Sequence, residues 1–404
     1  MKQIQLASSG KKGEKISSDC FIEICKNDSK GIKINIESKV EVMYGNSIRK
    51  LVKDMIKFFE LNNADIYIND FGALPFTLCA RFENAVKRLF PDITKEYLLP
   101  LNTNNKYKSS KDKLRRSRLY LPGNEPKFYT NAGLHNPDAI ILDLEDSVSP
   151  PEKDAAQLMV RNALRSVDFY KSERMVRINQ LPRGIEDLKF IVPHNVHVIL
   201  IPKCESAVHV KNVEREVEVL KELYNIKNDI YYMPIIESAR GVINAFEIAA
   251  ASDYNCALAV GLEDYTADIG TQRTNEGKES FYARSMVVNA AKAAGIQAID
   301  TVFSDISDMA GLKASVIEAK NLGFEGKGCI HPRQIKVINE TFAPTNDEID
   351  KAKNIVLAFE DAQSKGMGVV ALGSKMIDAP VVKRAQKVIE SALLNNIISK
   401  NWRE

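Results

Sequence analysis

From about residue 118 onward, short apolar runs alternate with segments of helical spacing, and this alternation restricts the folds open to the chain. Continuous apolar runs are typical of strands that are buried on both faces, as in a parallel sheet. About eight such strand–helix units predict a (β/α)8 barrel of the TIM type, within the α/β class, rather than an open doubly wound sheet. The expected strands are residues 119–121, 139–142, 175–178, 198–201, 231–236, 256–260, 298–301 and 328–330.

Length and charge narrow the class of protein further. The 404 residues exceed one ordinary domain, and 56 basic against 53 acidic residues give a net charge of only +3. This balance argues against nucleic acid or a membrane surface as a partner. No run approaches the ~20 apolar residues of a membrane helix, and no apolar signal segment opens the sequence. We therefore expect a cytoplasmic enzyme whose six scattered cysteines are reduced.

Residues 1–98 follow a different pattern from the rest of the chain. Residues 21–25 and 32–36 alternate as half-buried strands joined by a polar turn. Residues 47–61 have the apolar spacing of an amphipathic helix, and a further strand and helix are expected at 65–68 and 77–89. These features predict a small α+β domain in front of the barrel.

The remaining segments complete the expected domain layout. Residues 99–114 form a linker whose polar centre, 102–113, predicts a flexible tether. The barrel then spans 115–344, and 345–404 form a helical extension that could act as a flap over the barrel mouth. The arginines at 115, 116 and 118 could form a phosphate patch. A solvated linker that enters a strand explains most of the lysines of this basic cluster, but it explains the arginines next to the strand less well.

Acidic residues follow two neighbouring strands of the expected barrel. Glu237 comes directly after the strand at 231–236, and Glu263 and Asp264 follow the strand at 256–260. Because the carboxyl ends of parallel strands meet at one face of a barrel, these groups should point into one pocket. Close carboxylates repel one another unless a cation lies between them, and their hard oxygens favour Mg²⁺ over zinc.

Several other strands also end in polar residues. One such residue is more often a helix cap than a ligand, but their repetition around the barrel favours a site. The further candidates are Asn124, Glu145, Asp146, Arg177, Lys203, Glu205 and His331.

The ordered motifs RSRLYLPGN, DAIILDLEDSV, VRIN, IPKCES, PIIESARG, VGLEDYTADIG, KGCIHPRQI and GSKMIDAP resemble the beta subunit of citrate lyase and its relatives, the malyl-CoA and citramalyl-CoA lyases. This resemblance spans residues 116 to about 392. The segments ISSDCFIEI and DFGALPFTLCARFENAV resemble the gamma subunit, the acyl carrier protein, of citrate lyase. The chain thus resembles a carrier and a lyase fused through the linker.

The resemblance implies an activity, a retro-Claisen cleavage of a citryl thioester to oxaloacetate and an acetyl thioester. It implies Mg²⁺ ligands at Glu237 and Asp264, and an arginine, Arg177, that grips the keto-acid carboxylate. Glu263 and Asp264 would contact the substrate. Asp378, which spacing alone would assign to a helix cap or turn, matches an aspartate that reaches in from a neighbouring subunit to exchange a proton.

Supporting roles and partners follow from the same resemblance. Glu145 and Asp146 would support the metal through waters. Ser17 would carry a covalent phosphoribosyl-dephospho-CoA group, although Ser18 stands where the family usually has glycine and leaves the register open by one residue. We expect a homo-oligomer, as a trimer, and a separate alpha-type subunit that transfers the carrier.

The resemblance leaves open whether the substrate is a citryl, citramalyl or malyl thioester. A non-catalytic carrier or assembly subunit with a vestigial barrel is the remaining alternative.

Overall fold

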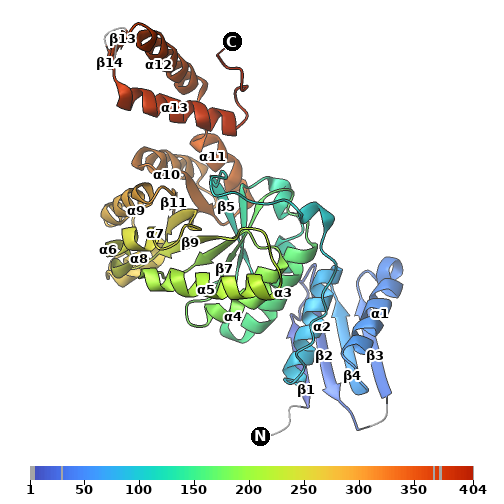
Figure 1. Ribbon diagram of the computed structural model, residues 1–404. Helices are drawn as coiled ribbons and strands as arrows, with labels where there is room; N and C mark the ends of the chain where they lie inside the picture. The colour runs from blue at the N-terminus through green and yellow to red at the C-terminus, as the bar shows by residue number, and fades with distance from the viewer. Residues whose placement is uncertain (1–4, 29–30, 367–368, 373–374, 404) are drawn as a thin grey trace.

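The structure is a computed structural model that describes residues 5–28, 31–366, 369–372 and 375–403. Figure 1 shows a small sheet domain at the N-terminus, a central barrel and a helical hairpin at the C-terminus. The expected eight-stranded parallel barrel is confirmed, and its strands close in chain order with β12 beside β5. The strands are β5 (Ser117–Pro122), β6 (Ala139–Asp143), β7 (Glu173–Arg177), β8 (Val198–Ile201), β9 (Tyr231–Ile236), β10 (Ala257–Val260), β11 (Gln297–Asp300) and β12 (Gly326–Cys329).

Helices surround the barrel and bury its outer strand faces. They are α3 (Lys153–Ser166), α4 (Gly184–Ile191), α5 (Ala207–Leu223), α6 (Ala239–Ile243), α7 (Ala245–Ala249), α8 (Leu262–Asp268), α9 (Phe281–Ala293), α10 (Met309–Leu322) and α11 (Pro332–Phe342). Short 3-10 turns supply the connection between β5 and β6.

Strand alternation separates two apolar cores within the barrel. In β5, Leu119 and Leu121 belong to the outer core between strands and helices. Tyr120, between them in sequence, packs against the inner core that fills the barrel. Since side chains alternate along a strand, Arg118 shares the inward face with Tyr120.

The small α+β domain is confirmed, with a different strand pairing from the one expected. Its sheet has the order β1-β2-β4-β3, formed by β1 (Leu6–Gly10), β2 (Cys20–Lys26), β4 (Asn63–Asp70) and β3 (Gly31–Ser38). The expected hairpin between residues 21–25 and 32–36 is wrong, because β4 lies between β2 and β3. β3 and β4 run parallel, so the chain crosses between them through α1 (Glu41–Phe58).

Helix α2 (Pro75–Leu89) joins the small domain to the barrel by packing against α3. The two helices share a fully buried ion pair in which Arg161 donates to both oxygens of Glu83 at 2.9 and 2.7 Å. Arg88 binds Asp154 at 2.6 and 2.7 Å near the other end of α2. Removing one partner of a buried pair costs about 3–5 kcal/mol, so the Arg161–Glu83 pair in particular fixes the small domain against the barrel.

The polar linker is bound along its length to the barrel, in contrast to the flexible tether expected from its composition. The backbone N–H of Asn102 donates to the backbone carbonyl of Arg165 at 2.7 Å. The buried Asn105 side chain donates to the Val167 carbonyl. Tyr107 donates to the Ser172 carbonyl at 2.6 Å. The polar side chains therefore satisfy backbone groups at the N-terminal end of the barrel.

The three arginines that follow the linker point to different partners. Arg115 forms a fully buried pair with Glu173 at 2.7 Å, and Arg116 pairs with Asp138 at 2.8 Å. Arg118 lies in the barrel interior, so the three do not form a phosphate patch.

The C-terminal extension is a hairpin of α12 (Asn346–Ser364) and α13 (Ala379–Leu394) with its own apolar core. Two short strands, β13 (Val370–Leu372) and β14 (Lys375–Ile377), connect the helices. Lys320 pairs with Glu348, and Arg116 contacts Asn395. Both anchors lie at the N-terminal end of the barrel strands, so the hairpin projects away from the mouth of its own barrel (Figure 1).

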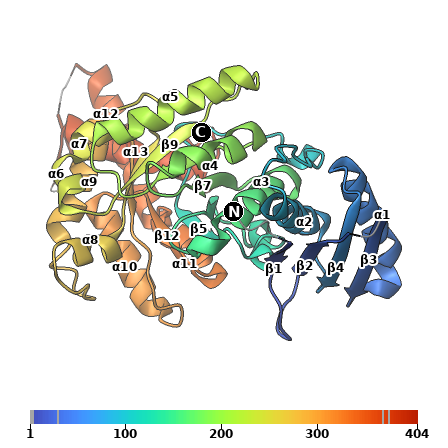
Figure 2. The same ribbon diagram turned by 90° about the horizontal axis from the view of Figure 1, so that it is seen from below.

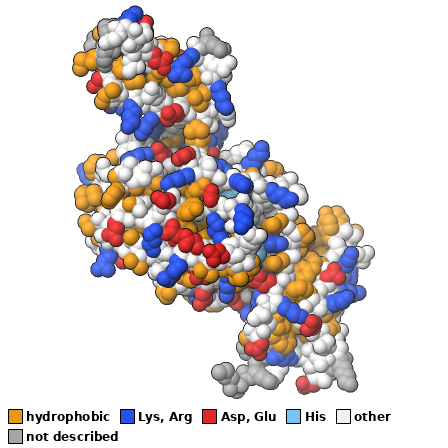
Figure 3. All heavy atoms as spheres, in the orientation of Figure 1, with side chains coloured by type: hydrophobic (Ala, Val, Ile, Leu, Met, Phe, Trp, Pro, Cys, Tyr) orange, Lys and Arg blue, Asp and Glu red, His pale blue; other side chains and the backbone are white. Residues whose placement is uncertain are grey.

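Among the described residues, no helix combines the length and apolar character that crossing a membrane requires. Figure 3 shows basic and acidic side chains interspersed over the visible face of the barrel. Neither positive nor negative charge therefore dominates this face.

Two buried histidines should make the free energy of unfolding depend on pH. Burial, reinforced by nearby arginines, lowers the pKa of His194 and of His197 to about 3 from an ordinary value of 6.5. The unfolded chain therefore binds more protons between these values, and stability must fall as the pH falls through this window. We expect the free energy of urea unfolding to fall by up to about 1.4 kcal/mol per pH unit for each histidine.

His197→Gln should make this pH dependence shallower, whereas His135→Gln, at an exposed position, should leave it unchanged. Equal slopes for wild type and His197→Gln would contradict the assignment.

Candidate active site

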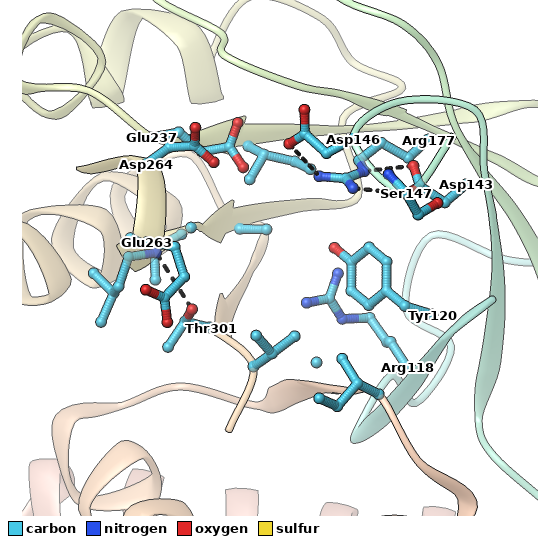
Figure 4. A pocket seen from close by; sticks show the side chains of 18 of the residues that line it. Arg118, Tyr120, Asp143, Asp146, Ser147, Arg177, Glu237, Glu263, Asp264 and Thr301 are labelled. Atoms are coloured by element: carbon cyan, nitrogen blue, oxygen red, sulfur yellow. Dashed lines mark hydrogen bonds and ion pairs between the residues drawn. The ribbon is translucent and has the colours of Figure 1, made fainter. Parts of the chain in front are cut away.

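A cavity of about 380 Å³ opens at the C-terminal ends of the barrel strands. This is the face at which barrel enzymes carry their sites. Figure 4 shows carboxylates and arginines facing this space from several strands. The polar lining residues are Arg118, Tyr120, Asp143, Asp146, Ser147, Arg177, Glu237, Glu263, Asp264, Asp300 and Thr301.

Glu237 and Asp264 lie together on one wall of the cavity, as the sequence predicts (Figure 4). Burial, helped by the neighbouring charges of Glu145 and Asp264, raises the pKa of Glu237 to about 8, although the backbone N–H of Lys203 and the charge of Arg177 oppose this shift. Gly261 makes room for this carboxylate, because a Cβ there would lie 2.5 Å from Glu237 Oε1. The pair presents oxygen ligands whose negative charges a cation would offset.

Lys203 supplies a positive charge beside these carboxylates. Its Nζ lies 3.3 Å from Asp264 Oδ1 and 3.8 Å from Glu145 Oε1. Its backbone N–H donates to Glu237 Oε2 at 2.9 Å from a left-handed conformation, φ +46°. This backbone conformation is unfavourable for a lysine, and it aims the N–H at the buried carboxylate.

Arg177, at the end of β7, is held by three acidic side chains. It donates to both oxygens of Asp143 at 2.7 Å, and its Nη1 lies 2.8 Å from Glu145 Oε2. Burial opposes the guanidinium charge, but the hydrogen bonds that Arg177 donates to the Asp143 carboxylate raise the pKa of Arg177 above its ordinary value. A substrate carboxylate would meet this arginine at the edge that Glu145 and the more distant Asp146 now face.

Glu263 and Asp264 differ in what their side chains contact. Arg273 donates to Glu263 Oε1 at 2.6 Å, and the Glu263 side chain is 61% exposed. Asp264 instead faces Lys203 and the buried Glu237. Of the two adjacent acids, Asp264 therefore has the surroundings of a metal ligand.

Arg118 and Tyr120 lie across the cavity from Glu237 and Asp264 (Figure 4). Thr301 lies beside Glu263, where its hydroxyl accepts a hydrogen bond from the Leu262 N–H at 3.3 Å.

Sequence reasoning missed Arg118, Tyr120 and Thr301 as site residues. The sequence suggested for Arg118 only a possible phosphate patch shared with Arg115 and Arg116, although its alternation with Leu119 places it inside the barrel. Strand phase was the signal that could have found it.

Several expected site residues lie outside the cavity of this chain. Asp378 is the N-cap of α13 and accepts a bond from the Val381 N–H at 3.1 Å. His331 likewise caps α11, and Glu205 accepts a bond from Ser238 Oγ at 2.8 Å. In this chain, Asp378 and His331 thus cap helices, and Glu205 accepts a hydrogen bond from a neighbouring loop, all outside the cavity.

Ser17 lies on an exposed loop at the rim of the barrel. Two residues away, the buried Asp19 pairs with Arg81, which also donates to the Asn124 carbonyl at 3.0 Å. Lys11, at the other end of the loop, contacts Glu125. Ser18 has a φ of +57°, the backbone region that favours glycine, which matches its place at the usual glycine of the carrier motif.

The two adjacent acids allow a direct test of the metal ligands. Asp264→Asn and Glu263→Gln each remove one negative charge, but only the first faces Glu237. We expect Asp264→Asn to weaken Mg²⁺ binding at least about 10-fold, measured by calorimetry, and Glu263→Gln to retain it. Equal losses in both variants would show that overall charge, rather than ligation, governs binding.

Known proteins are similar to both the barrel and the N-terminal domain of this chain. Residues 116–332 match the family model for HpcH/HpaI aldolase/citrate lyase, and residues 9–89 match the acyl carrier model described as malonate decarboxylase delta subunit. The citrate lyase subunit beta of Leuconostoc mesenteroides subsp. cremoris is 42% identical over 290 residues, which cover 71% of this chain and 96% of that protein.

Relatives with other substrates and a solved structure are also similar. The mitochondrial citramalyl-CoA lyase of Homo sapiens is 33% identical over 291 residues, covering 69% of this chain and 85% of that protein. Protein CitE from Mycobacterium tuberculosis, in a crystal structure with magnesium, acetoacetate and coenzyme A, has a TM-score of 0.58 at 29% identity. That match covers 70% of this chain and 99% of that one.

The carrier match is to a family described by a subunit of a different enzyme from citrate lyase, so it supports an acyl-carrier domain without fixing its prosthetic group. The barrel, its strand-end acids and the relatives together make the protein a carbon–carbon lyase. The chain belongs to the HpcH/HpaI aldolase/citrate lyase family and joins a barrel of the citrate lyase beta type to an N-terminal acyl-carrier-like domain.

Proposed function

We propose that this protein is a Mg²⁺-dependent lyase that cleaves a citryl thioester, carried on its own N-terminal domain, to oxaloacetate and an acetyl thioester. The observation that carries the proposal is the paired Glu237 and Asp264 at the barrel mouth. The carrier loop is fastened to the rim of that same mouth through Arg81 and Asn124.

The residues present fit a hard divalent cation. Glu237 and Asp264 would supply two oxygen ligands, and among the described residues no group of three or more acidic, histidine or cysteine side chains is placed to hold a metal ion by itself. Two protein carboxylates leave coordination positions for water and substrate oxygens, as Mg²⁺ prefers. When bound, Mg²⁺ would acidify the substrate hydroxyl and stabilise the forming keto acid.

The chain's own residues would orient the substrate around this centre. Arg177 would hold the carboxylate beside the reacting carbon, with Asp143 fixing its orientation through two hydrogen bonds. Glu145 and Asp146, which face Arg177, would support metal-bound waters. The backbone N–H of Glu263, in the first turn of α8, would donate to a substrate oxygen.

Cleavage leaves a thioester enolate that must take up a proton, and we assign this step to Asp378 of a neighbouring subunit. The hairpin carries Asp378 away from the cavity of its own chain, which supports action in a second molecule. The active form would then be a homo-oligomer, as a trimer. Each subunit would complete the site of another.

Ser17 is the proposed attachment site for phosphoribosyl-dephospho-CoA. Its exposure leaves the hydroxyl open to modification, and the left-handed φ of Ser18 supports placing the motif register on Ser17. Because the carrier domain is docked, the swinging element would be the prosthetic arm rather than the domain. A separate alpha-type subunit would exchange acetate for citrate on this arm.

Citramalyl or malyl thioesters are the second candidate substrates, favoured by the similarity to citramalyl-CoA lyase. The identity to citrate lyase subunit beta is higher, 42% against 33%. A purely non-catalytic carrier or assembly role would leave the paired ligands and Arg177 unexplained.

One experiment tests both halves of the proposal. Wild-type protein with Mg²⁺ should cleave citryl-CoA to oxaloacetate, and protein from the native host should carry a mass adduct of prosthetic-group size. Ser17→Ala should lose the adduct and carrier-dependent turnover but still cleave free citryl-CoA, because the barrel is intact. The matched variant Ser18→Ala should keep the adduct.

Absence of cleavage by the wild type with any of the three thioesters would contradict the lyase assignment. An unmodified Ser17 in native protein would contradict the carrier assignment alone.

Mixing two inactive variants tests the role of Asp378. Glu237→Gln disables the metal site, and Asp378→Asn removes the acid while keeping a residue that caps helices well. If Asp378 acts in a neighbouring subunit, dissociated and reassociated mixtures should regain about one quarter of wild-type activity, since each working site draws intact residues from two different chains. Activity no higher than that of the separate variants would contradict action in a neighbouring subunit, and full activity of Asp378→Asn alone would place Asp378 outside the mechanism.

A further inference from the structure

Arg118 is a buried cation without a carboxylate partner. Its side chain is 2% exposed, and its Nη1 lies 3.0 Å from the sulfur of Met233, a weak acceptor. Its Nε has no hydrogen-bond partner in the described part of the chain, and no acidic group there lies within ion-pair distance. Burial accordingly lowers the pKa of Arg118, although an arginine stays charged.

Four other buried arginines, Arg81, Arg115, Arg161 and Arg284, pair with carboxylates. Arg81 binds Asp19 at 2.8 Å, and Arg161 binds Glu83 at 2.7 Å. Arg115, three residues before Arg118, binds Glu173 at 2.7 Å.

The fifth, Arg174, has no carboxylate partner in the described part of the chain, but it donates to the carbonyls of Asn195 and Asn105 at 2.8 and 3.1 Å, whereas Arg118 has only a thioether sulfur. An isolated buried charge is costly unless a partner arrives, so Arg118 stands apart as a cation kept ready for an anion.

The strands on either side of Arg118 leave space for its long side chain inside the barrel. Arg118 pairs in register with Gly328 of β12 on one side and with Ala139 of β6 on the other. The small neighbours leave room for a long inward-pointing side chain. Arg118 lines the same cavity as Glu237 and Asp264, and Figure 4 shows it with Tyr120 across the cavity from them.

The candidate substrates differ in the group that could reach this wall. All three share the hydroxyl and carboxylate that the metal side of the cavity would hold. The remaining substituent on the carbinol carbon is a carboxymethyl group in citryl, a methyl group in citramalyl and hydrogen in malyl thioesters. Only the first carries a charge.

We propose that Arg118 binds the additional carboxylate of the substrate and makes this site selective for a dicarboxylic keto acid, oxaloacetate, over pyruvate and glyoxylate. This inference rests on the proposed lyase function and assigns its substrate class. A pyruvate in the same place would leave the buried guanidinium unpaired, and sites with unpaired polar groups discriminate strongly against the smaller ligand.

The test compares wild type with Arg118→Met, which removes the charge and keeps an unbranched side chain. Binding of oxaloacetate and of pyruvate is measured by calorimetry with Mg²⁺, and condensation of each with acetyl-CoA is followed in parallel. We expect wild type to prefer oxaloacetate, and Arg118→Met to lower the ratio of the two affinities about 100-fold. Arg118→Lys, which keeps a positive charge, should retain part of this preference.

Melting without ligand separates this role from a structural one. An unpaired buried charge destabilises the empty protein, so Arg118→Met should melt at a higher temperature than wild type. A lower melting temperature, or an unchanged affinity ratio in folded Arg118→Met, would overturn the inference and leave the lyase function intact. Wild type that binds and condenses neither keto acid would instead refute the proposed function.

Discussion

The mouth of this barrel depends on holding several carboxylates close together. Asp143, Glu145, Glu237 and Asp264 come from three different strand ends, and their mutual repulsion would splay the loops apart. Arg177 and Lys203 counter this repulsion, Arg177 by binding Asp143 and Glu145, and Lys203 by lying near Glu145 and Asp264. Glu237 is the carboxyl that remains unbalanced, because burial raises its pKa to about 8 and so disfavours its charged form. A metal ion would therefore complete an electrostatic arrangement that the protein has only partly balanced.

Sequence patterning predicted the barrel because its strands are continuous apolar runs, and each observed strand lies within a few residues of its expected position. Glu237 and Asp264 could be predicted as site residues for the same reason, since they follow two of these apolar runs. β1 was missed because Leu6–Gly10 holds one large apolar residue. The hairpin error arose because alternation identifies strands but not their neighbours.

Residues whose role depends on three-dimensional partners could not be assigned from sequence. Glu263 and Asp264 are adjacent acids, and only the structure shows that Arg273 binds the first. The polar composition of the linker predicts that its asparagines face solvent, whereas Asn105 is buried and donates to the Val167 carbonyl. The family resemblance supplied Asp378 and Ser17, since a cap position and a loop serine carry no local sign of chemistry.

The bound linker changes what the fusion of carrier and lyase means. In a fusion through a flexible chain, only the length of the connection would be constrained, and its sequence could drift freely. Here Tyr107 and Asn105 satisfy carbonyl groups of the barrel, and the docked helix α2 buries Glu83 against Arg161. If the carrier and the barrel were separate molecules, these contacts would have to form between two chains and would depend on concentration. Within one chain, the covalent connection and the buried contacts together hold the carrier loop at a constant place beside the barrel.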